Sequence, residues 1–366
     1  MKKTVHLMGI GGTGMVSLAG MFQETGWNVR GSDSKIYPPT STELERLKIP
    51  VAEGYKPENL QPPPDLVIVG NVVSRGNPEV EALLKTSIPY TSMAQALAKY
   101  FLEGRRSVVV AGTHGKTTTT SLLAWILLKG GRDPGLFVGG MPKNFGQGYR
   151  IGSGEPFVVE GDEYDTAFFE KSPKFLHYTP QDVIITSIEF DHADIYRDLD
   201  HVIEQFEKLV ALLPKEGTLL AWGGSDTVKK ICSKRKDGEP QYYGCDSCHD
   251  WRALDTRVTS TGTAFDVEYQ GKILTHIESP LLGKHNVLNA VAAIGMATKL
   301  GVNPEDSLKA VSTFEGIRRR QEFLGEARGV RVYDDFAHHP TAVAETLAAF
   351  RPMADARKGR LWAIYE

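Results

Sequence analysis

Short apolar runs alternate with amphipathic stretches along the N-terminal part of the chain. Apolar positions three or four residues apart predict helices, and short continuous apolar runs bounded by glycine or charged residues predict buried strands. The predicted elements are, in order, a strand over 4–9, a helix over 15–25, strands over 27–31 and 65–70, and a strand followed by a helix over 87–101. This alternation indicates a small α/β domain over residues 1–104.

The same alternation starts again after a charged link over residues 103–106. The predicted elements are a strand over 107–112, a helix over 116–129, strands over 157–160 and 182–189, and, after further helices, a β-rich run over 253–276. We expect these elements to form a second α/β domain over residues 105–312.

From residue 313 onward the pattern opens a third α/β unit. It contains a strand over 329–335, a helix after Pro340 and a last strand over 359–365. A doubly wound domain typically needs on the order of 100 residues, so residues 313–366 are predicted to be the start of an incomplete C-terminal domain.

Composition and charge exclude several classes of protein. The chain has 366 residues, with 42 Lys and Arg against 45 Asp and Glu, which gives a formal net charge of −3. This balance provides no broad basic surface for nucleic acid, so any phosphate binding must be local. The first residues run into glycines and not into a secretion signal, and no apolar stretch approaches the roughly 20 residues that span a bilayer. We therefore expect a cytoplasmic protein that binds neither nucleic acid nor membranes, with its three cysteines reduced.

One cysteine pattern has an alternative meaning. Cys245, Cys248 and His249 have the spacing of covalent haem attachment and could also bind a metal. The chain offers no second cysteine pair that would complete a zinc site, and the segment is polar and glycine-rich. We interpret the spacing as incidental.

A glycine-rich turn joins the strand over 107–112 to the helix over 116–129. Its residues are Gly112, Thr113, His114, Gly115, Lys116, Thr117 and Thr118. Backbone N–H groups and the helix dipole attract a polyphosphate at such a turn. We expect Lys116 to neutralise the phosphates of ATP and the Thr117 hydroxyl to bind Mg²⁺. The general phosphate-loop signature would place a glycine where this chain has Val110, so a plain strand-to-helix turn is the alternative.

Magnesium needs further ligands, and two candidates follow predicted strands. Glu160 ends the strand over 157–160, and His192 follows the strand over 182–189. Because the carboxyl ends of parallel strands meet at one edge of a sheet, we expect both side chains near the phosphate turn. The acidic run after Glu160 would, taken alone, be read as a solvated loop.

A second glycine turn follows the first predicted strand. Its residues are Gly9, Ile10, Gly11, Gly12, Thr13 and Gly14, and Asp33 lies at about the distance of a ribose-binding acid. The motif alone favours NAD, but a helix N-terminus holds any diphosphate, including that of a UDP-sugar. The residues leave both ligands open. The predicted fold class is α/β, with a Rossmann-like N-terminal domain, a P-loop-type central ATPase domain and a truncated Rossmann-like C-terminal domain.

Six segments occur in the order found in Mur ligases: GTHGKTTT, EGDEYD, EFDHADIY, GKHNVLNA, IRRRQEFLG and YDDFAHHPT. The resemblance covers the whole chain and implies an ATP-dependent ligase that forms an amide bond. YPPTSTELE, GNVVSRGNPEVEA and EYDTAFFEKSPKFLHYTP are similar to members that join L-alanyl-γ-D-glutamyl-meso-diaminopimelate, a murein tripeptide, to UDP-N-acetylmuramate in peptidoglycan recycling. They are less similar to the UDP-N-acetylmuramate–L-alanine ligases, which stay the alternative.

The resemblance implies roles for residues of both glycine turns. The turn over 9–14 would hold the UDP diphosphate, with Asp33 and the loop over 71–77 near the uridine and sugar. The residues of that loop with implied roles are Asn71, Ser74 and Arg75. Thr117 and Glu160 would bind one magnesium ion and His192 a second.

The resemblance also implies ATP contacts late in the chain. Asn286 and Asn289 would contact adenine, Arg320 the phosphates and Asp335 the ribose, with His338 and His339 nearby in undefined roles. Each has a simpler explanation taken alone. The asparagines could cap a helix beginning near Val287, residues 318–320 could be a solvated charge run, and residues 334–335 a turn at the end of a strand.

The implied mechanism passes through an acyl phosphate, with Lys116, Glu160, His192 and Arg320 stabilising negative charge. Lys208 is not in register with the carbamylated lysine of some relatives, so that modification is not predicted. Because the C-terminal domain of the family closes over ATP, we expect these 366 residues to bind the UDP-sugar but to ligate poorly. An NAD-dependent oxidoreductase and a UDP-sugar sensor that does not bind ATP are rivals from other classes.

Overall fold

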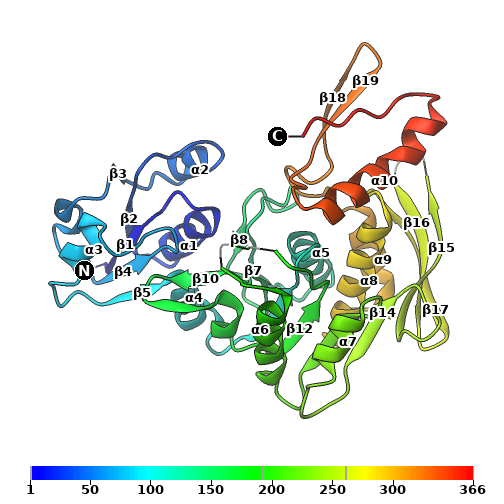
Figure 1. Ribbon diagram of the computed structural model, residues 1–366, viewed down its shortest axis with the longest axis horizontal. Coiled ribbons are helices and arrows are strands. Elements are labelled where there is room, and N and C mark those ends of the chain that lie inside the picture. The colour runs from blue at the N-terminus through cyan, green and yellow to red at the C-terminus, as the bar shows by residue number, and fades with distance from the viewer. Residues whose placement is uncertain (1, 192, 194, 260–261, 366) are drawn as a thin grey trace.

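The computed structural model describes residues 2–191, 193, 195–259 and 262–365. The chain begins with a five-stranded parallel sheet of order β3-β2-β1-β4-β5, at the left of Figure 1. Its strands are β1 (Thr4–Met8), β2 (Asn28–Asp33), β3 (Val51–Glu53), β4 (Leu66–Val69) and β5 (Tyr90–Ser92). Its helices are α1 (Thr13–Glu24), α2 (Thr40–Leu47), α3 (Pro78–Leu83) and α4 (Met93–Leu97), with short 3₁₀ and π turns at Pro57–Leu60 and Ala98–Leu102. The predicted order of elements is confirmed here.

A ten-stranded sheet forms the centre of the molecule, in the order β17-β16-β15-β14-β13-β12-β6-β9-β7-β8. Its strands are β6 (Arg106–Ala111), β7 (Gly135–Phe137), β8 (Tyr149–Arg150), β9 (Pro156–Gly161), β12 (Asp182–Ile185), β13 (Thr218–Trp222), β14 (Gln241–Gly244), β15 (Trp251–Val258), β16 (Thr263–Tyr269) and β17 (Lys272–Ser279). Pairing is parallel from β15 to β7, while β16, β17 and β8 are antiparallel to their neighbours.

Helices cover both faces of this sheet. They are α5 (Lys116–Lys129), α6 (Leu199–Ala211), α7 (Asp226–Cys232), α8 (Lys284–Lys299) and α9 (Pro304–Ser312). Successive residues of β6 alternate between two cores: Val108 and Val110 pack with α5 and α8, and Val109 packs with α6. Because both faces are covered, the strand is a continuous apolar run and shows no polar alternation. This places the end of β6 and the start of α5 in the middle of the sheet.

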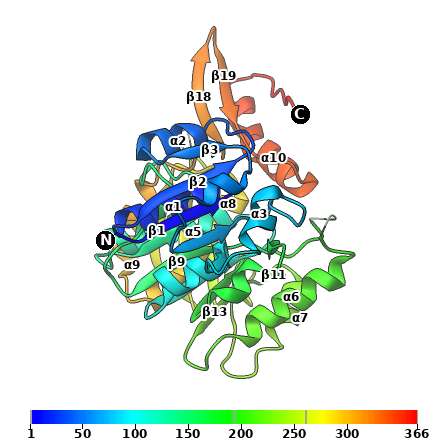
Figure 2. The ribbon, with the colours of Figure 1, turned by 90° about the vertical axis from the view of Figure 1, so that its left-hand side faces the viewer.

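Contacts at two places, among others, join the N-terminal domain to the central domain. Gly20 of α1 lies against the ring of Tyr149 in β8, where any Cβ would overlap the ring. A small hairpin of β10 (Asp165–Ala167) and β11 (Glu170–Pro173), followed by the 3₁₀ turn Lys174–His177, extends from the central domain. Phe168 at its tip packs against the apolar cluster of the N-terminal domain. Figure 2 shows these two domains stacked along the line of sight.

The C-terminal part consists of an antiparallel hairpin, β18 (Glu322–Ala327) and β19 (Val330–Asp334), and of α10 (Pro340–Ala356). Ala349 and Phe350 of α10 pack against Leu282, just before α8. The hairpin projects from the rest of the molecule in both ribbon views (Figures 1 and 2). Among the described residues, no helix is both long enough and apolar enough to cross a membrane.

The structure corrects two predicted strands and adds several that were not predicted, among them β3, β7, β13 and β18. Residues 359–365 form no strand, and Trp362 and Ile364 are largely exposed, because no described strand pairs with them. The strand predicted over 182–189 ends at Ile185, since the chain leaves the sheet there to contact the turn after β6. β18 was not predicted from its charged sequence.

Candidate active site

The turn between β6 and α5 is held by the chain segment that follows β12. The N–H of Thr113 donates to the carbonyl of Ser187 at 2.7 Å, and the N–H of His114 donates to the Ser187 hydroxyl at 3.0 Å. Gly115 has a φ of +82°, and a Cβ there would lie 2.5 Å from Oδ1 of Asn289. Gly112 also has a positive φ, and its Cβ would overlap the Thr186 hydroxyl. Only glycine fits at both positions, because protein atoms pack against them. Helix α5 begins without a side-chain cap, so its N-terminus is suited to an anion.

Lys116 points back over this turn. Its ammonium donates to the Gly112 carbonyl at 2.6 Å and to the Glu163 carboxylate at 2.8 Å. Burial alone would lower the pKa of Lys116, but the carboxylates of Glu163 and Asp162 outweigh burial and raise it. Lys116 is therefore a largely buried cation, with its side chain 12% exposed, beside the uncapped N-terminus of α5, and this arrangement suits a polyphosphate.

Thr117 and Glu160, the two predicted magnesium ligands that the structure describes, are brought together. The Thr117 hydroxyl donates to Oε1 of Glu160 at 2.6 Å, and the N–H of Gly139 donates to Oε2 at 2.6 Å. Burial and the nearby Asp162 raise the pKa of Glu160. A hydroxyl and a buried carboxylate are oxygen donors of the kind that Mg²⁺ binds. His192, the third predicted ligand, lies outside the described residues.

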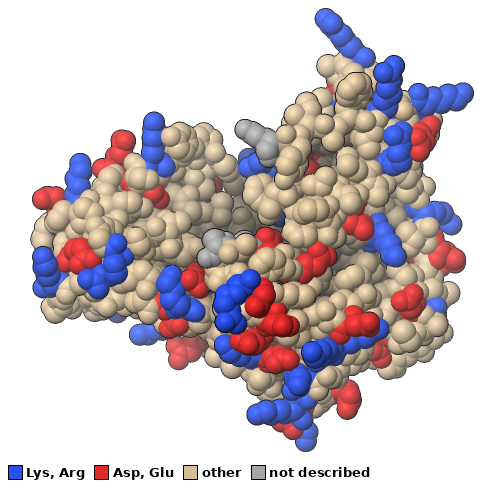
Figure 3. Space-filling view, in the orientation of Figure 1, with Lys and Arg blue, Asp and Glu red and all other residues tan. Residues whose placement is uncertain are grey.

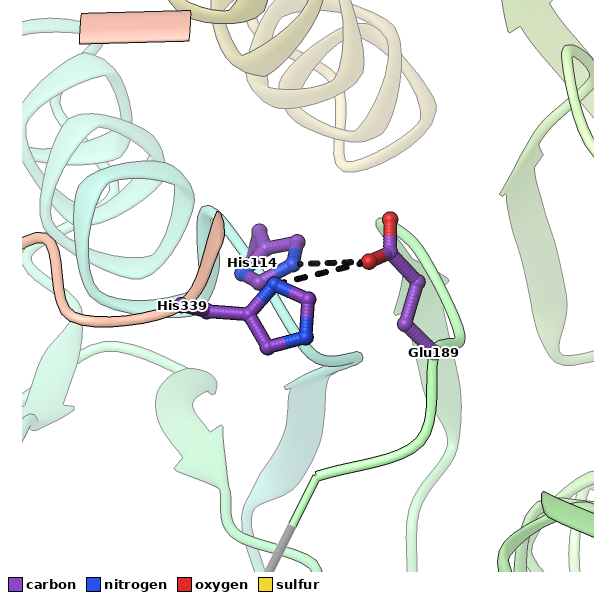
Figure 4. Close-up of side chains that lie close together, drawn as sticks. All are labelled: His114, Glu189 and His339. Atoms are coloured by element: carbon purple, nitrogen blue, oxygen red, sulfur yellow. Dashed lines mark ion pairs between the residues drawn. The ribbon is translucent and has the colours of Figure 1, made fainter. Parts of the chain in front are cut away.

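A second cluster beside the turn was not predicted. Oε2 of Glu189 lies 3.4 Å from Nε2 of His114 and 3.6 Å from Nδ1 of His339, and it accepts the Thr341 hydroxyl at 2.8 Å (Figure 4). Burial lowers the pKa of His114, although Glu189 acts in the opposite direction. The cluster joins the phosphate turn to the start of α10. Its members are far apart in the sequence, so no spacing could have indicated it.

The asparagines of α8 lie beside the phosphate turn. The helix begins at Lys284 after Gly283, without a side-chain cap, so the capping explanation is wrong. Asn286 donates to the Leu282 carbonyl at 2.8 Å, and Asn289 donates to Oδ1 of Asn286 at 3.2 Å. Both side chains are buried. Their predicted contact with adenine stays a prediction.

Arg320 and Asp335 lie in the C-terminal part. The Arg320 guanidinium lies 5.3 Å from the ring centroid of Phe336. The Asp335 carboxylate accepts hydrogen bonds from the N–H groups of Gln321 and Ala337, both at 2.8 Å. It therefore connects the residue just before β18 to the loop before α10. These contacts hold the loop before α10 within the C-terminal part, while the predicted contacts of both residues with ATP stay predictions.

The N-terminal glycine turn is organised by a carboxylate. Asp33 accepts the N–H of Gly11 at 2.7 Å and the Tyr55 hydroxyl at 3.1 Å. A Cβ on Gly11 would lie 2.9 Å from Oδ2 of Asp33. The helix α1 starts at Thr13 without a side-chain cap, which leaves its terminus suited to an anion. Asp33 therefore supports the turn, and its predicted ribose contact stays a prediction.

The loop over residues 71–77 borders this turn. Val72 and Val73 pack close to Gly9: a Cβ at this position would lie 3.2 Å from a methyl carbon of each valine. Asn71 and Ser74 are exposed. Arg75 pairs with Glu81 at 2.8 Å on the surface. Figure 3 shows that the surface is hollowed between the N-terminal domain and the C-terminal part of the chain.

The cysteine pattern does not converge on a metal site. Cys245 and Cys248 are exposed free thiols, whereas His249 is buried against Gly223 and Gly244. Among the residues that the structure describes, these three do not form a group of close ligand atoms. The interpretation as an incidental spacing agrees with this packing.

Known protein families match most of the chain. Residues 4–104 match the Mur ligase family catalytic domain, residues 110–297 the Mur ligase middle domain, and residues 319–365 the Mur ligase glutamate ligase domain. The chain belongs to the Mur ligase family. This confirms the resemblance noted in the sequence and the three-part α/β fold, and it replaces the oxidoreductase alternative.

Members of the Mur ligase family differ in their sequence identity to this chain. The UDP-N-acetylmuramate–L-alanyl-gamma-D-glutamyl-meso-2,6-diaminoheptandioate ligase of Escherichia coli (strain K12) is 44% identical over 95% of this chain and 75% of its own length. A UDP-N-acetylmuramate–L-alanine ligase of Endomicrobium trichonymphae is 35% identical over 95% of this chain and 75% of its own length. The crystal structure of a murein peptide ligase from Psychrobacter arcticus 273-4 superposes with a TM-score of 0.84 and 36% identity, covering 99% of this chain and 80% of that chain.

Sequence reasoning missed some residues of this candidate site. Glu163 was noted in an acidic run but not as the partner of Lys116, and Ser187 was placed inside a strand. A loop that follows the neighbouring parallel strand is where such residues are expected, so strand order could have indicated Ser187 and Glu189. Strand order is itself a property of the fold and is not visible in spacing.

Proposed function

We propose that this Mur ligase joins the tripeptide L-alanyl-γ-D-glutamyl-meso-diaminopimelate to UDP-N-acetylmuramate at the expense of ATP, in peptidoglycan recycling. The observation that carries the proposal is the 44% identity, over 95% of the chain, to a ligase named for these substrates. The arrangement of Lys116, Thr117 and Glu160 at the start of α5 supports the ATP-dependent part. A cytoplasmic location is part of the proposal.

The proposal divides the substrates between the two glycine turns. The turn after β1 would hold the UDP diphosphate, and the turn after β6 the triphosphate of ATP. Thr117 and Glu160, with His192 outside the described residues, would hold Mg²⁺, which shields the negative charge of the phosphates. The boundaries of the three domains, at 104/105 and 312/313, belong to the same proposal.

The lactyl carboxylate of UDP-N-acetylmuramate is a poor electrophile, so it must be activated before an amine can attack it. An oxygen of the lactyl carboxylate forms a bond to the terminal phosphorus of ATP, and ADP leaves. The tripeptide amine then bonds to the carbonyl carbon and loses a proton, while inorganic phosphate departs. The chain has to stabilise the charge on both groups, and the Lys116 ammonium, the N-terminus of α5 and the Arg320 guanidinium are the cationic elements suited to this task.

The alternative acceptor is L-alanine alone, because ligases of that name are 35% identical to this chain. The hairpin of β10 and β11 lies within the segment 163–180, which resembles the tripeptide-adding members. This segment connects Glu163, the partner of Lys116, to the N-terminal domain through Phe168. It is therefore placed to affect both halves of the reaction.

Phosphate release tests the proposal. The protein would be given ATP, Mg²⁺ and UDP-N-acetylmuramate with either the tripeptide or L-alanine. We expect release with the tripeptide to exceed release with L-alanine at least tenfold in initial rate, a ratio worth about 1.4 kcal/mol of transition-state stabilisation. Equal rates, or a preference for L-alanine, would contradict the choice of acceptor. If ATP does not bind in calorimetry, the ligase proposal itself fails and the sensor alternative gains support.

A further inference from the structure

Three side chains from separate segments meet beside the phosphate turn, apart from the residues assigned to magnesium. His114 lies in the turn, Glu189 follows β12, and His339 immediately precedes α10. One ligand atom from each lies within 4.8 Å of the other two (Figure 4). The Glu189 backbone is fixed, because its N–H donates to the Thr113 hydroxyl at 2.9 Å and its carbonyl accepts from that hydroxyl at 3.3 Å.

The distances suit a shared metal ion better than hydrogen bonds. N–H···O hydrogen bonds are about 2.7–3.2 Å long, whereas the two nitrogens lie 3.4 and 3.6 Å from Oε2 of Glu189. Zinc binds imidazole nitrogen and carboxylate oxygen at about 2.0–2.2 Å, and in a tetrahedron such ligands lie roughly 3.3–3.6 Å apart. The separations of the two histidine nitrogens from Glu189 match two edges of that tetrahedron.

A second observation also indicates a ligand. Nε2 of His114 is shielded from solvent and has no hydrogen-bond partner among the described residues. A buried nitrogen without a partner is uncommon and is compensated when a ligand occupies the adjacent space. The same nitrogen is the atom that lies 3.4 Å from Glu189.

We propose that His114, Glu189 and His339 bind a zinc-class divalent transition metal ion. Two imidazoles and one carboxylate favour such an ion over Mg²⁺, which prefers oxygen ligands. Three protein ligands leave a fourth position for water. When the ion binds, the Thr341 hydroxyl keeps its hydrogen bond to Glu189. The 3.3 Å hydrogen bond from the Thr341 N–H to Nδ1 of His339 is lost, because that nitrogen then binds the ion.

The site would connect parts of the chain that the proposed function does not connect. An ion bound here ties the start of α10 to the phosphate turn through His114, so metal binding fixes the C-terminal part against the ATP site. Metal binding at this site does not depend on the identity of the acceptor or of the sugar nucleotide. All three ligands are side chains of this chain.

Cobalt absorption tests this site. The chain, free of added histidine tags and treated with chelator, would be titrated with Co²⁺ while visible absorption is recorded. Tetrahedral Co²⁺ with nitrogen ligands absorbs strongly, and octahedral Co²⁺ in an oxygen site absorbs weakly. We expect a strong band that saturates at stoichiometric Co²⁺, disappears on addition of Zn²⁺ and persists in excess Mg²⁺.

Matched variants locate the ion. His339→Ala and Glu189→Gln should each weaken Co²⁺ binding by more than the roughly 10–100-fold that loss of an outer partner costs. His338→Ala removes the adjacent, exposed imidazole and should leave binding unchanged. Glu160→Gln, in the magnesium pair, should also leave the band intact. Circular dichroism confirms that each variant is folded.

Several outcomes would overturn the proposal. One is the absence of a strong cobalt band from the unaltered chain. Another is a band that survives both His339→Ala and Glu189→Gln in folded protein. A band that Mg²⁺ removes, or that Glu160→Gln abolishes, would assign the ion to the oxygen site. None of these results bears on phosphate release, so this proposal and the proposed function can fail separately.

Discussion

The two glycine turns use the same backbone device and differ in their side chains. Each follows a central parallel strand, and each opens a helix that lacks a side-chain cap, α1 in one case and α5 in the other. The turn before α5 carries a largely buried cation, Lys116, between acidic partners. The turn before α1 carries no cation, and the carboxylate of Asp33 holds its backbone. Glycine spacing therefore predicts an anion site, and the surrounding charge decides which anion.

The difference matters because the two anions carry different charge. A triphosphate with its metal ion needs a fixed cation and nearby oxygen ligands, while a diphosphate within a sugar nucleotide can be held by N–H groups and a helix terminus. In the central domain the buried carboxylates of Glu160 and Glu163 and the largely buried Lys116 form one charged group around a single turn. Substitutions in this group should weaken ATP binding or turnover, and substitutions in the N-terminal turn should weaken binding of the sugar nucleotide.

Loss of the Lys116 cation is expected to have the largest effect. Lys116→Ala removes the charge facing the phosphates and leaves Glu163 without this partner, so phosphate release should fall by about 10²–10³-fold or more. Binding of UDP-N-acetylmuramate, measured by calorimetry, should be nearly unchanged. Lys129→Ala, at the exposed other end of α5, is the control and should retain turnover. Loss of sugar-nucleotide binding together with turnover in folded Lys116→Ala protein would contradict the division between the turns.

Alanine at one glycine of each turn should separate the two ligands. Gly115→Ala demands an αL backbone, which costs an L-residue roughly 1–2 kcal/mol, and its Cβ would lie 2.5 Å from Asn289. Gly11→Ala needs no unusual backbone conformation, but its Cβ would lie 2.9 Å from Oδ2 of Asp33 and would displace that carboxylate. We expect ATP affinity to fall about tenfold in the first variant and affinity for the sugar nucleotide about tenfold in the second.

Calorimetry of both ligands with both variants makes this a crossed experiment. Each variant is the control for the other, because each should retain normal affinity for the ligand of the opposite turn. If either substitution weakens both ligands equally, the turns act as one site and the comparison fails.

Local signals predicted the helices around the turns better than the strands that continue from them. The helix over 116–129 was predicted with its observed bounds, because Gly115 begins it and two glycines end it. The strand after residue 182 was predicted too long, since Thr186 and Ile188 are buried and resemble strand residues. Their burial results from contact with the phosphate turn, which depends on which strands are neighbours.

Pairing between distant segments also limited the prediction of the site. Residues 359–365 have the composition of a strand, but a strand forms only where a neighbour can pair with it. Lys116, Thr117 and Glu160 could be grouped in advance because strand ends meet at one edge of a parallel sheet. The contact of Glu189 with His339 could not, because it depends on how α10 packs on α8.

The smallest expected effect is a pH dependence of stability at the central turn. Burial and Asp162 raise the pKa of Glu160 above its ordinary value of 4.5, so the folded chain holds this proton more tightly than the unfolded chain does. The stability that Glu160 contributes is then fully present below the unfolded pKa and is lost as the pH rises through the raised folded pKa. In Glu160→Gln this loss is absent. The Tm of the variant minus that of the unaltered chain should therefore increase from about pH 4.5 upward and then level off.

Thermal unfolding followed by circular dichroism, between about pH 4 and pH 8, measures this difference. The Gln side chain cannot accept from both Thr117 and Gly139, so the variant loses a hydrogen bond at every pH, and only the slope of the difference carries information. Glu155→Gln, an exposed carboxylate just before the same strand, is the control for removing a negative charge from β9. A difference in Tm that is flat or that shrinks as the pH rises would show that Glu160 is not strained by burial. The contrast with the N-terminal turn would then rest on Lys116 alone.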